Sequence, residues 1–211
     1  MAVVTLQEQD FQDAARRLRC DVPAIRAVAE VESSGSGFLA DGRPRILFEG
    51  HIFSRYTKGI YNANYPDISY PKWDVSKYAK GPNAEARGQG EWARLIKAKM
   101  LNERAALFSA SYGMFQIMGF NHSLCGYTSV DTFVEDMGES ARNHLLAFCE
   151  YIVHVRLDDE LRNHYWKEFA KRYNGPMYQK NRYDEKLALA YARHVAALKP
   201  KAPTPTLVAK K

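Results

Sequence analysis

The chain has 211 residues, of which 46% are hydrophobic and 12% aromatic, and its formal net charge is +6. A chain of this length buries enough surface to form a core without disulfides or bound metal, so one compact domain is expected. The sequence contains no run of about 18 apolar residues, which is the length needed to span a membrane. The first residues, "MAVVTLQEQDFQDAARRLRC", lack the features of a secretory signal peptide. The sequence therefore predicts a cytosolic protein with no integral membrane segment.

The side chains that usually bind metals are scattered. Cys20, Cys125 and Cys149 are widely spaced and form no CxxC pair, and the histidines show no HExxH or HxxxH spacing. This pattern predicts reduced, structural cysteines, no metal and no cofactor. The positive net charge favours an anionic partner, which could be nucleic acid, acidic lipid or a bacterial wall polymer.

Helical periodicity begins near the amino terminus. It predicts one helix over residues 5–19 and a second over "DVPAIRAVAEVES", with Asp21 as its cap and Pro23 in its first turn. From Gly35 to about Pro82, Gly, Pro, Asn and Tyr recur and the apolar stretches are short. This composition predicts a loop-rich insert that contains a small β-hairpin.

Helical patterns then return for most of the remaining chain. They cover residues 83–110, 130–157, 158–173 and 178–198. The last residues, "KPKAPTPTLVAKK", have no apolar period and predict a disordered tail over 198–211. The expected fold class is mainly α, a helical domain over residues 1–197 with the loop-rich insert after the second helix.

Two carboxylates, Glu30 and Glu32, lie at the end of the second helix. At about 100° per residue, Glu30 shares the polar face with Arg26, as an ordinary solvated pair. Glu32 falls inside the apolar stripe, between Ile25 and Val28. Burial raises the pKa of a carboxyl group and keeps a proton on it, so the pattern predicts a general acid. The alternative is that Glu32 reaches solvent at the helix end or pairs with an arginine.

Three short segments occur in order along the chain: "ESSGSGF" (32–38), "SYGMFQIM" (111–118) and "RYNGP" (172–176). Together they resemble the lysozyme-like superfamily that cleaves peptidoglycan, which includes goose-type lysozymes and lytic transglycosylases. The stretch "AVAEVESSGSGFLADGRPRILFEGHIF" is more closely similar to the N-acetylmuramidase domain of phage endolysins. The resemblance covers roughly residues 7–197 and implies an α+β lysozyme-like fold.

The resemblance also implies roles for individual residues. Glu32, which Ser33 follows directly, would be the general acid, and Ser33 would bind substrate. The floor of the cleft would contain Tyr112, Gly113, Met114 and Gln116, with Tyr173 and Asn174 on the opposite side. One departure is Phe115, which stands where the family pattern usually has Met; the residue remains bulky and apolar.

Glycoside hydrolysis usually needs a second carboxylate, which attacks the sugar or activates water. Glu49 is the leading candidate because it interrupts the apolar stretch "RILFEGHIF", where a hairpin could place it across the cleft. Asp41 is the lesser candidate, since Asp-Gly is first of all a turn former. If no second carboxylate faces Glu32, the sugar's own 6-hydroxyl could close on the anomeric carbon, as in lytic transglycosylases. Glu49 favours hydrolysis.

The expected function is a peptidoglycan muramidase that a phage uses for host lysis. It would act as a monomer, cutting between N-acetylmuramic acid and N-acetylglucosamine after release from the host cytoplasm to the wall. A basic helical nucleic-acid-binding protein is the alternative from another class. The basic residues are interspersed with acidic ones and no helix-turn-helix stands out, so no nucleic-acid partner is expected. A wall-binding protein with an inactive lysozyme fold is a third possibility.

Overall fold

The computed structural model describes residues 5–32, 37–175 and 178–198. Its helices and strands, in chain order, are α1 (Glu8–Leu18), α2 (Val22–Glu32), β1 (Ile46–Phe48), α3 (Gly50–Tyr56), η1 (Val75–Lys77), α4 (Ala84–Leu101), α5 (Glu103–Phe108), β2 (Ala110–Tyr112), β3 (Ile117–Met118), η2 (Gly119–Cys125), α6 (Val130–Met137), α7 (Ala141–His154), α8 (Asp158–Arg162), α9 (Trp166–Tyr173), η3 (Tyr178–Asn181) and α10 (Tyr183–Ala197), where η marks a 3-10 helix.

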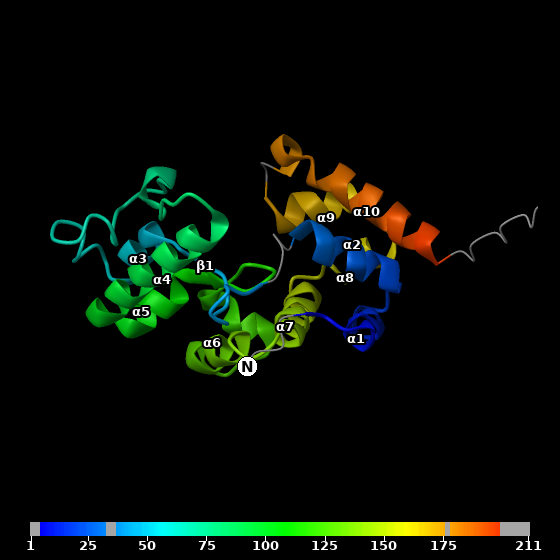
Figure 1. Cartoon of the computed structure of the whole chain (residues 1–211), viewed down its shortest axis with the longest axis horizontal. Helices are drawn as coiled ribbons and strands as arrows, with labels where there is room; N and C mark the ends of the chain where they lie inside the picture. The colour runs from blue at the N-terminus through cyan, green and yellow to red at the C-terminus, as the bar shows by residue number, and fades with distance from the viewer. Residues whose placement is uncertain (1–4, 33–36, 176–177, 199–211) are drawn as a thin grey trace, which may run out of the picture.

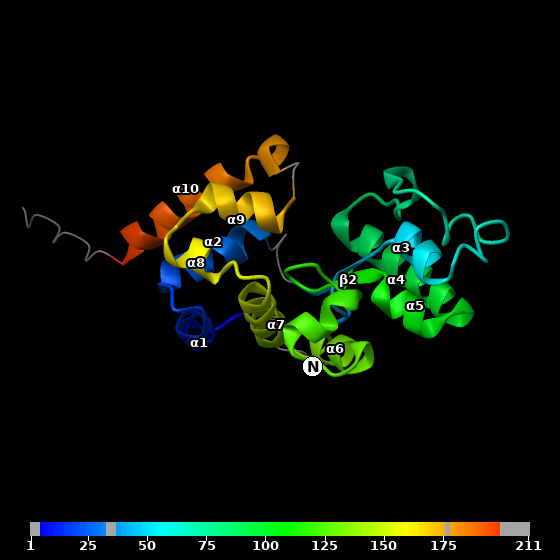
Figure 2. The same ribbon diagram turned by 180° about the vertical axis from the view of Figure 1, so that it is seen from behind.

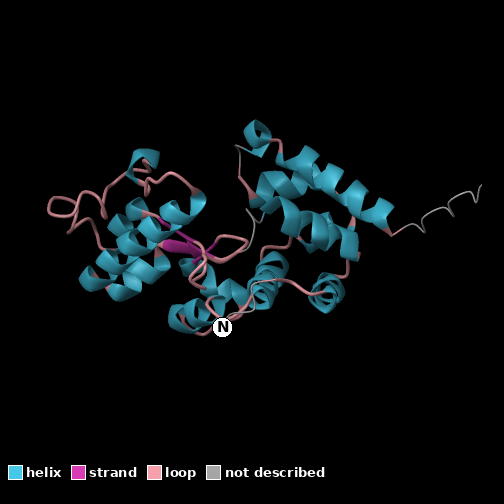
Figure 3. Cartoon of the chain, viewed as in Figure 1, coloured by secondary structure: helices cyan, strands magenta, loops and turns pink. Residues whose placement is uncertain are grey.

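The helices form two groups on either side of the small sheet (Figure 1). The terminal lobe contains α2, α8, α9 and α10, so a helix from the start of the chain packs there against the last one. The insert lobe contains α3, α4 and α5, and the view from behind shows the same division (Figure 2). Helices α6 and α7 lie below and between the lobes. The strands lie at the edge of the insert lobe that faces the terminal lobe (Figure 3), with β1 against α4. The mainly α fold with a small sheet is as the sequence predicts.

The three strands form one antiparallel sheet in the order β1-β2-β3. Ile46 lies opposite Tyr112, and Ser111 lies opposite Met118. The β2–β3 hairpin is therefore made by "SYGMFQIM", outside the insert. The small hairpin within the insert is limited to a tight antiparallel turn, in which the Leu39 N–H donates to the Arg43 carbonyl at 2.8 Å. The insert supplies β1, which pairs outside the insert, and an isolated antiparallel bridge between Phe38 and Pro44. Short apolar stretches gain ladder hydrogen bonds only from a partner strand, and here β2 supplies them.

Side-chain caps set where several helices begin. The Ala24 N–H donates to Asp21 Oδ1 at 2.9 Å, and Pro23 lies in the first turn of α2, as predicted. The helical stretch expected over 83–110 divides at Asn102, whose side chain accepts a hydrogen bond from the Ala105 N–H. The stretch over 130–157 divides in the same way at Ser140. A capping oxygen satisfies an amide at the start of a helix, so it favours a new helix over a continuous one.

The polar face of α2 is tied to its neighbours. Glu30 pairs with Arg193 and His194 of α10, and Arg26 pairs with Glu8 of α1. The expected pair between Arg26 and Glu30 is therefore wrong, because partners on adjacent helices take both charges. Glu30 does lie on the exposed side of the helix, as its position on the helical wheel indicates.

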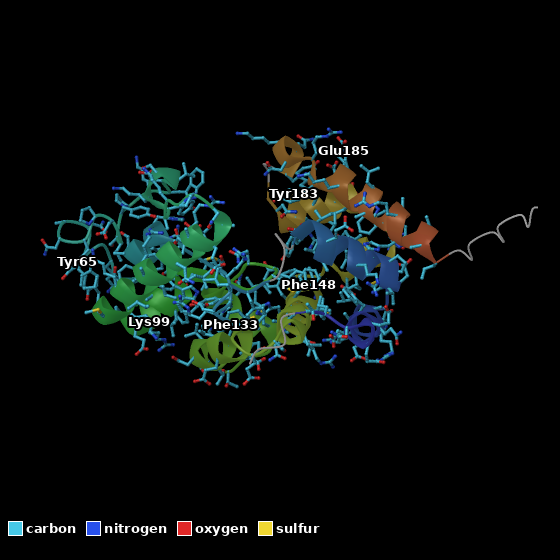
Figure 4. The ribbon with its side chains drawn as sticks, in the orientation of Figure 1. Tyr65, Lys99, Phe133, Phe148, Tyr183 and Glu185 are labelled. Atoms are coloured by element: carbon cyan, nitrogen blue, oxygen red, sulfur yellow. The ribbon has the colours of Figure 1, made fainter. Side chains whose placement is uncertain are left out.

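An aromatic cluster joins the hairpin turn to α7 and α9. Phe148 of α7 is fully buried, stacks on Phe115 at 4.4 Å between ring centroids, and meets Tyr173 edge-on at 5.7 Å. Phe169 stacks on the other side of Tyr173 at 5.4 Å. Figure 4 places Phe148 between the two groups of helices. The cluster therefore holds the hairpin turn, α7 and α9 in one arrangement.

The three cysteines are free thiols, and burial raises the pKa of each to about 12. No helix in the described ranges is long and apolar enough to cross a lipid bilayer. Of the tail expected to be disordered, residues 199–211 lie outside the described residues. Leu198 ends α10 as its cap.

Replacing Phe148 with alanine tests the aromatic cluster. We expect Phe148→Ala to lower the free energy of unfolding by about 3–5 kcal/mol, because it removes a buried ring and leaves a cavity. Met100→Ala is the control: Met100 is 83% exposed, so its loss should change stability by less than about 0.5 kcal/mol. Urea unfolding followed by circular dichroism measures both, and equal losses would contradict the central place given to Phe148.

Candidate active site

Glu32 ends α2 at a cavity of about 450 Å³ in which all three sequence segments meet. We call this the acid cavity. Its walls are formed by Glu32, Phe115, Gln116, Ile117, Met118, Asn121, Tyr151, Tyr173, Asn174 and Tyr183. Tyr183 is seen at the edge of the terminal lobe that faces the other lobe (Figure 4). Glu32 is the one carboxyl group in these walls, and the neighbouring aromatic and aliphatic side chains remove part of its hydration.

Two opposing influences act on the Glu32 carboxyl group. Burial raises its pKa, because the charged form loses hydration. The Asn174 amide donates a hydrogen bond to Glu32 Oε1 at 3.0 Å and, with the charge of Lys186, lowers the pKa in part. Burial is the larger effect and the pKa stays above its ordinary value. The group is suited to carry a proton to a substrate in the cavity.

Tyr173 holds one wall of the acid cavity. Its hydroxyl donates to the Phe115 carbonyl at 3.2 Å, and burial together with the nearby Glu32 raises its pKa well above the ordinary value. The phenol therefore stays protonated and fixes α9 to the hairpin turn. The pKa of Tyr183 is raised in the same direction, first by burial and then by Glu32.

The hairpin turn is stabilised by hydrogen bonds among its own residues. Gly113 and Gln116 both have positive φ, 73° and 48°, and Gln116 pays for this left-handed conformation with about 1 kcal/mol. The Gln116 amide donates to the Gly113 carbonyl at 2.8 Å and accepts from the Ser111 hydroxyl at 2.8 Å. These hydrogen bonds offset the cost of the left-handed backbone conformation at Gln116. They also orient its side-chain amide toward the residues of the hairpin turn.

His144 of α7 supports the turn from below. The Met114 N–H donates to His144 Nδ1 at 3.2 Å, and Nε2–H donates to the Met137 carbonyl at 2.7 Å. A Cβ at Gly113 would lie 2.8 Å from the ring, and one at Gly37 would lie 2.6 Å from Nδ1. Both glycines are therefore required for the close approach. Burial lowers the pKa of His144 to about 4, so the ring is neutral near pH 7.

A second cavity, of about 370 Å³, adjoins the acid cavity at Gln116, which borders both. We call it the side cavity. Its walls are formed by Gly37, Arg45, Ile46, Leu47, Tyr78, Ala79, Ala84, Arg87, Gly88, Glu91, Gly113, Met114 and Gln116.

The predicted substrate residues are thus divided between several places. Gln116, Tyr173 and Asn174 line the acid cavity with Glu32, whereas Gly113 and Met114 line the side cavity. Tyr112 does not reach the cleft: it is 1% exposed, donates to the Leu107 carbonyl and packs edge-on against Phe133. Side chains alternate along β2, and its Tyr112 side chain points into the core. Ser33 lies outside the described residues.

Neither candidate for the second carboxylate lines the two cavities. Glu49 precedes α3 rather than standing on a hairpin, and its oxygens accept from the Tyr78 hydroxyl at 2.9 and 3.0 Å. His51 Nδ1 lies 3.2 Å from Glu49 Oε2, and burial raises the pKa of Glu49. Asp41 is exposed, and hydrogen bonds from Arg43 and Gln89 hold its pKa well below the ordinary value. Asp41 therefore stabilises its turn.

Three residues of the acid cavity lie outside the three sequence segments and were missed by sequence reasoning: Asn121, Tyr151 and Tyr183. Phe115, Ile117 and Met118 lie within "SYGMFQIM" but were assigned no binding role. Asn121 follows the hairpin closely, so its proximity to "SYGMFQIM" could have identified it. Tyr151 and Tyr183 belong to ordinary amphipathic helices, and no local signal separates them from core or surface tyrosines. In the described ranges no group of three His, Cys, Asp or Glu side chains is placed to hold a metal ion.

A partly buried carboxyl group at a helix end, in a cavity formed with a hairpin turn in a mainly helical fold, is the arrangement expected of a lysozyme-type glycoside hydrolase. Residues 21–195 match the family of N-acetylmuramidases, and the chain belongs to this family. A solved structure titled "Crystal structure of Burkholderia AP3 phage endolysin" is similar in fold, with a TM-score of 0.83 and 39% identity. The similarity covers 93% of this chain and 73% of that chain. No curated protein sequence matches the chain.

The neutral His144 makes the stability of the fold depend on pH. Unfolded histidine has a pKa of 6.5 and folded His144 one of about 4, so the unfolded state binds more protons between these values. The free energy of unfolding that the neutral His144 contributes is fully present above pH 6.5. It is lost as pH falls toward 4, by about 3 kcal/mol in total. Urea unfolding at pH 7 and pH 4 should show a smaller pH effect in His144→Gln than in the wild type. Equal effects in the two proteins would contradict this account of His144.

Proposed function

We propose that the acid cavity is where the chain cleaves the glycosidic bond between N-acetylmuramic acid and N-acetylglucosamine in bacterial peptidoglycan, with Glu32 as the general acid. The observation that carries this proposal is the placement of Glu32. It is a partly buried carboxyl group with a raised pKa at the end of α2, and it accepts a hydrogen bond from Asn174 of the third sequence segment. Membership of the N-acetylmuramidase family supports the choice of substrate.

In the proposed reaction, Glu32 donates its proton to the bridging oxygen as the bond to the anomeric carbon breaks. The raised pKa keeps the proton available near neutral pH, and the cavity walls limit competition from water. The Asn174 amide keeps the carboxyl group in one orientation and stabilises the carboxylate that remains after donation. Gln116, Tyr173 and Tyr183 would contact the sugars, because they line the same cavity.

Glu49 is the residue we propose for the second carboxylate of a hydrolytic reaction. It precedes α3 of the insert lobe, across from α2 (Figure 1), and it is half-buried with a raised pKa. Glu49 is, however, hydrogen-bonded to Tyr78 and does not line the acid cavity. These two observations support, to the same degree, a route that needs no second carboxylate. In that route the sugar's 6-hydroxyl forms a bond to the anomeric carbon and its proton passes to the Glu32 carboxylate.

We propose further that the chain is a phage endolysin, which degrades the wall after release from the host cytoplasm. The solved relative is a phage endolysin by its title, and its similarity covers 93% of this chain. We assign residues 1–197 to one catalytic domain that acts as a monomer. The net charge of +6 would draw it to the anionic wall. Many arginines are paired with carboxylates, such as Arg17 with Glu150 and Arg172 with Glu160, so charge offers no argument for a nucleic-acid partner.

Substitution of the acid tests the proposal. We expect Glu32→Gln to reduce lysis of outer-membrane-permeabilised cells at least 100-fold, because an amide cannot donate the proton. Glu30→Gln is the matched control, since it changes an exposed glutamate two positions earlier on α2 and should leave the lysis rate near that of the wild type. Normal lysis by Glu32→Gln would remove Glu32 from this role.

The same assay separates the two routes when Glu49→Gln is included and the masses of the products are measured by mass spectrometry. Hydrolysis through Glu49 should give reducing muramic ends and lose about 100-fold of its rate in Glu49→Gln. Products lighter by one water, with the rate of Glu49→Gln near wild type, would assign the 6-hydroxyl route instead.

A further inference from the structure

The side cavity borders the acid cavity but is not used by the proposed reaction. The two share Gln116, and the turn residues Gly113 and Met114 line the side cavity. A substrate whose scissile bond lies beside Glu32 would therefore present its neighbouring groups to the side cavity.

The charge in the side cavity is positive. Arg45 and Arg87 line it, and they donate to the carbonyls of Ala84 and Gly81 at 3.4 and 3.3 Å. Arg87 is exposed and forms no ion pair with any residue in the described part of the chain. The Arg87 guanidinium, held by a carbonyl, keeps its full charge and its remaining donors for an anion.

The acidic residue in the side cavity, Glu91, does not cancel this charge. Glu91 is 4% exposed, and its oxygens accept from the Phe48 N–H at 3.0 Å and the Ala79 N–H at 2.6 Å. The Arg94 guanidinium lies 2.7 Å from Glu91 Oε2. The charge of Glu91 is therefore compensated by these protein groups and does not offset the two arginines.

The remaining walls suit small aliphatic groups. They include Ile46, Leu47, Ala79, Ala84 and Met114, whereas Tyr78 is the one aromatic side chain among the described residues that line this cavity. Sugar rings are usually bound against aromatic faces, which the acid cavity offers through Tyr151, Tyr173 and Tyr183. The side cavity combines aliphatic walls with guanidinium groups and fits a short acidic peptide better than a sugar.

Peptidoglycan carries such a peptide next to the bond that is cut. The lactyl carboxyl group of N-acetylmuramic acid is joined by an amide bond to a stem peptide, so the negative charge of the substrate lies on that peptide. Its alanine methyl groups match the aliphatic walls, and its carboxylates match the guanidinium of Arg87. We propose that the side cavity binds the stem peptide, so that the enzyme prefers glycan strands that bear peptides. This inference rests on the proposed function.

Kinetics on two forms of one substrate test the inference. Purified glycan strands are compared before and after an amidase has removed their peptides. We expect the wild-type kcat/KM to be about tenfold higher on the peptide-bearing strands. Arg87→Gln should raise KM about threefold on peptide-bearing strands, with kcat unchanged, and should not alter KM on stripped strands. Arg104→Gln, an exposed arginine of the insert lobe that lines neither cavity, should match the wild type on both.

Two results would overturn the inference while leaving the proposed function intact. One is equal wild-type kcat/KM on both substrates. The other is an equal loss by Arg87→Gln on both, which would mean that the side cavity binds a sugar. Failure of the wild type to cleave either substrate would instead overturn the proposed function, and the inference with it.

Discussion

The desolvation of a single carboxyl group is the constraint on which the rest of the site depends. Glu32 occupies a position on α2 where the neighbouring face is apolar, and burial raises its pKa. The Asn174 amide limits that effect and orients the group. A carboxyl group with no hydrogen bond would be costly to bury, whereas a fully solvated one would lose its proton near pH 4. The single amide donor places Glu32 between these limits.

That balance requires segments far apart in the chain to meet within a few ångströms. Phe148 packs against both Phe115 and Tyr173, and the Tyr173 hydroxyl donates to the Phe115 carbonyl. His144 fixes the other end of the turn through the Met114 N–H. Stability and chemistry are therefore coupled through α7: the same helix supplies the aromatic ring and the neutral imidazole that position the turn. A loss of packing there would also move the wall that shields Glu32 from water.

The sequence is sufficient to predict the parts of the fold and site that depend on local pattern. The class of fold, the cap of α2 by Asp21 and the apolar setting of Glu32 all follow from residues within a few turns of one another. The ordered trio of segments correctly indicates the N-acetylmuramidase family. Its assignment of individual residues stays a prediction, although Gln116, Tyr173 and Asn174 do lie with Glu32 in one cavity.

What could not be predicted depends on long-range partners. The strand Ile46–Phe48 could pair within the insert or outside it, and only the three-dimensional structure shows that β2 is its partner. That pairing leaves Glu49 before a helix, beside Tyr78, instead of on a hairpin. The family resemblance implies that Tyr112 lies in the cleft, but strand alternation directs its side chain into the core. The partners of Glu30 and Arg26 on other helices were hidden for the same reason.

The most direct test is the titration of Glu32 itself. Carboxyl ¹³C NMR of the full chain, with the Glu32 resonance assigned by its loss in Glu32→Gln, would give the pKa of this group. The structure requires a midpoint above the ordinary value of 4.5, moving higher still in Asn174→Ala because the hydrogen bond that favours the charged form is gone. A midpoint at or below 4.5 would show a solvated carboxylate and contradict the role given to Glu32.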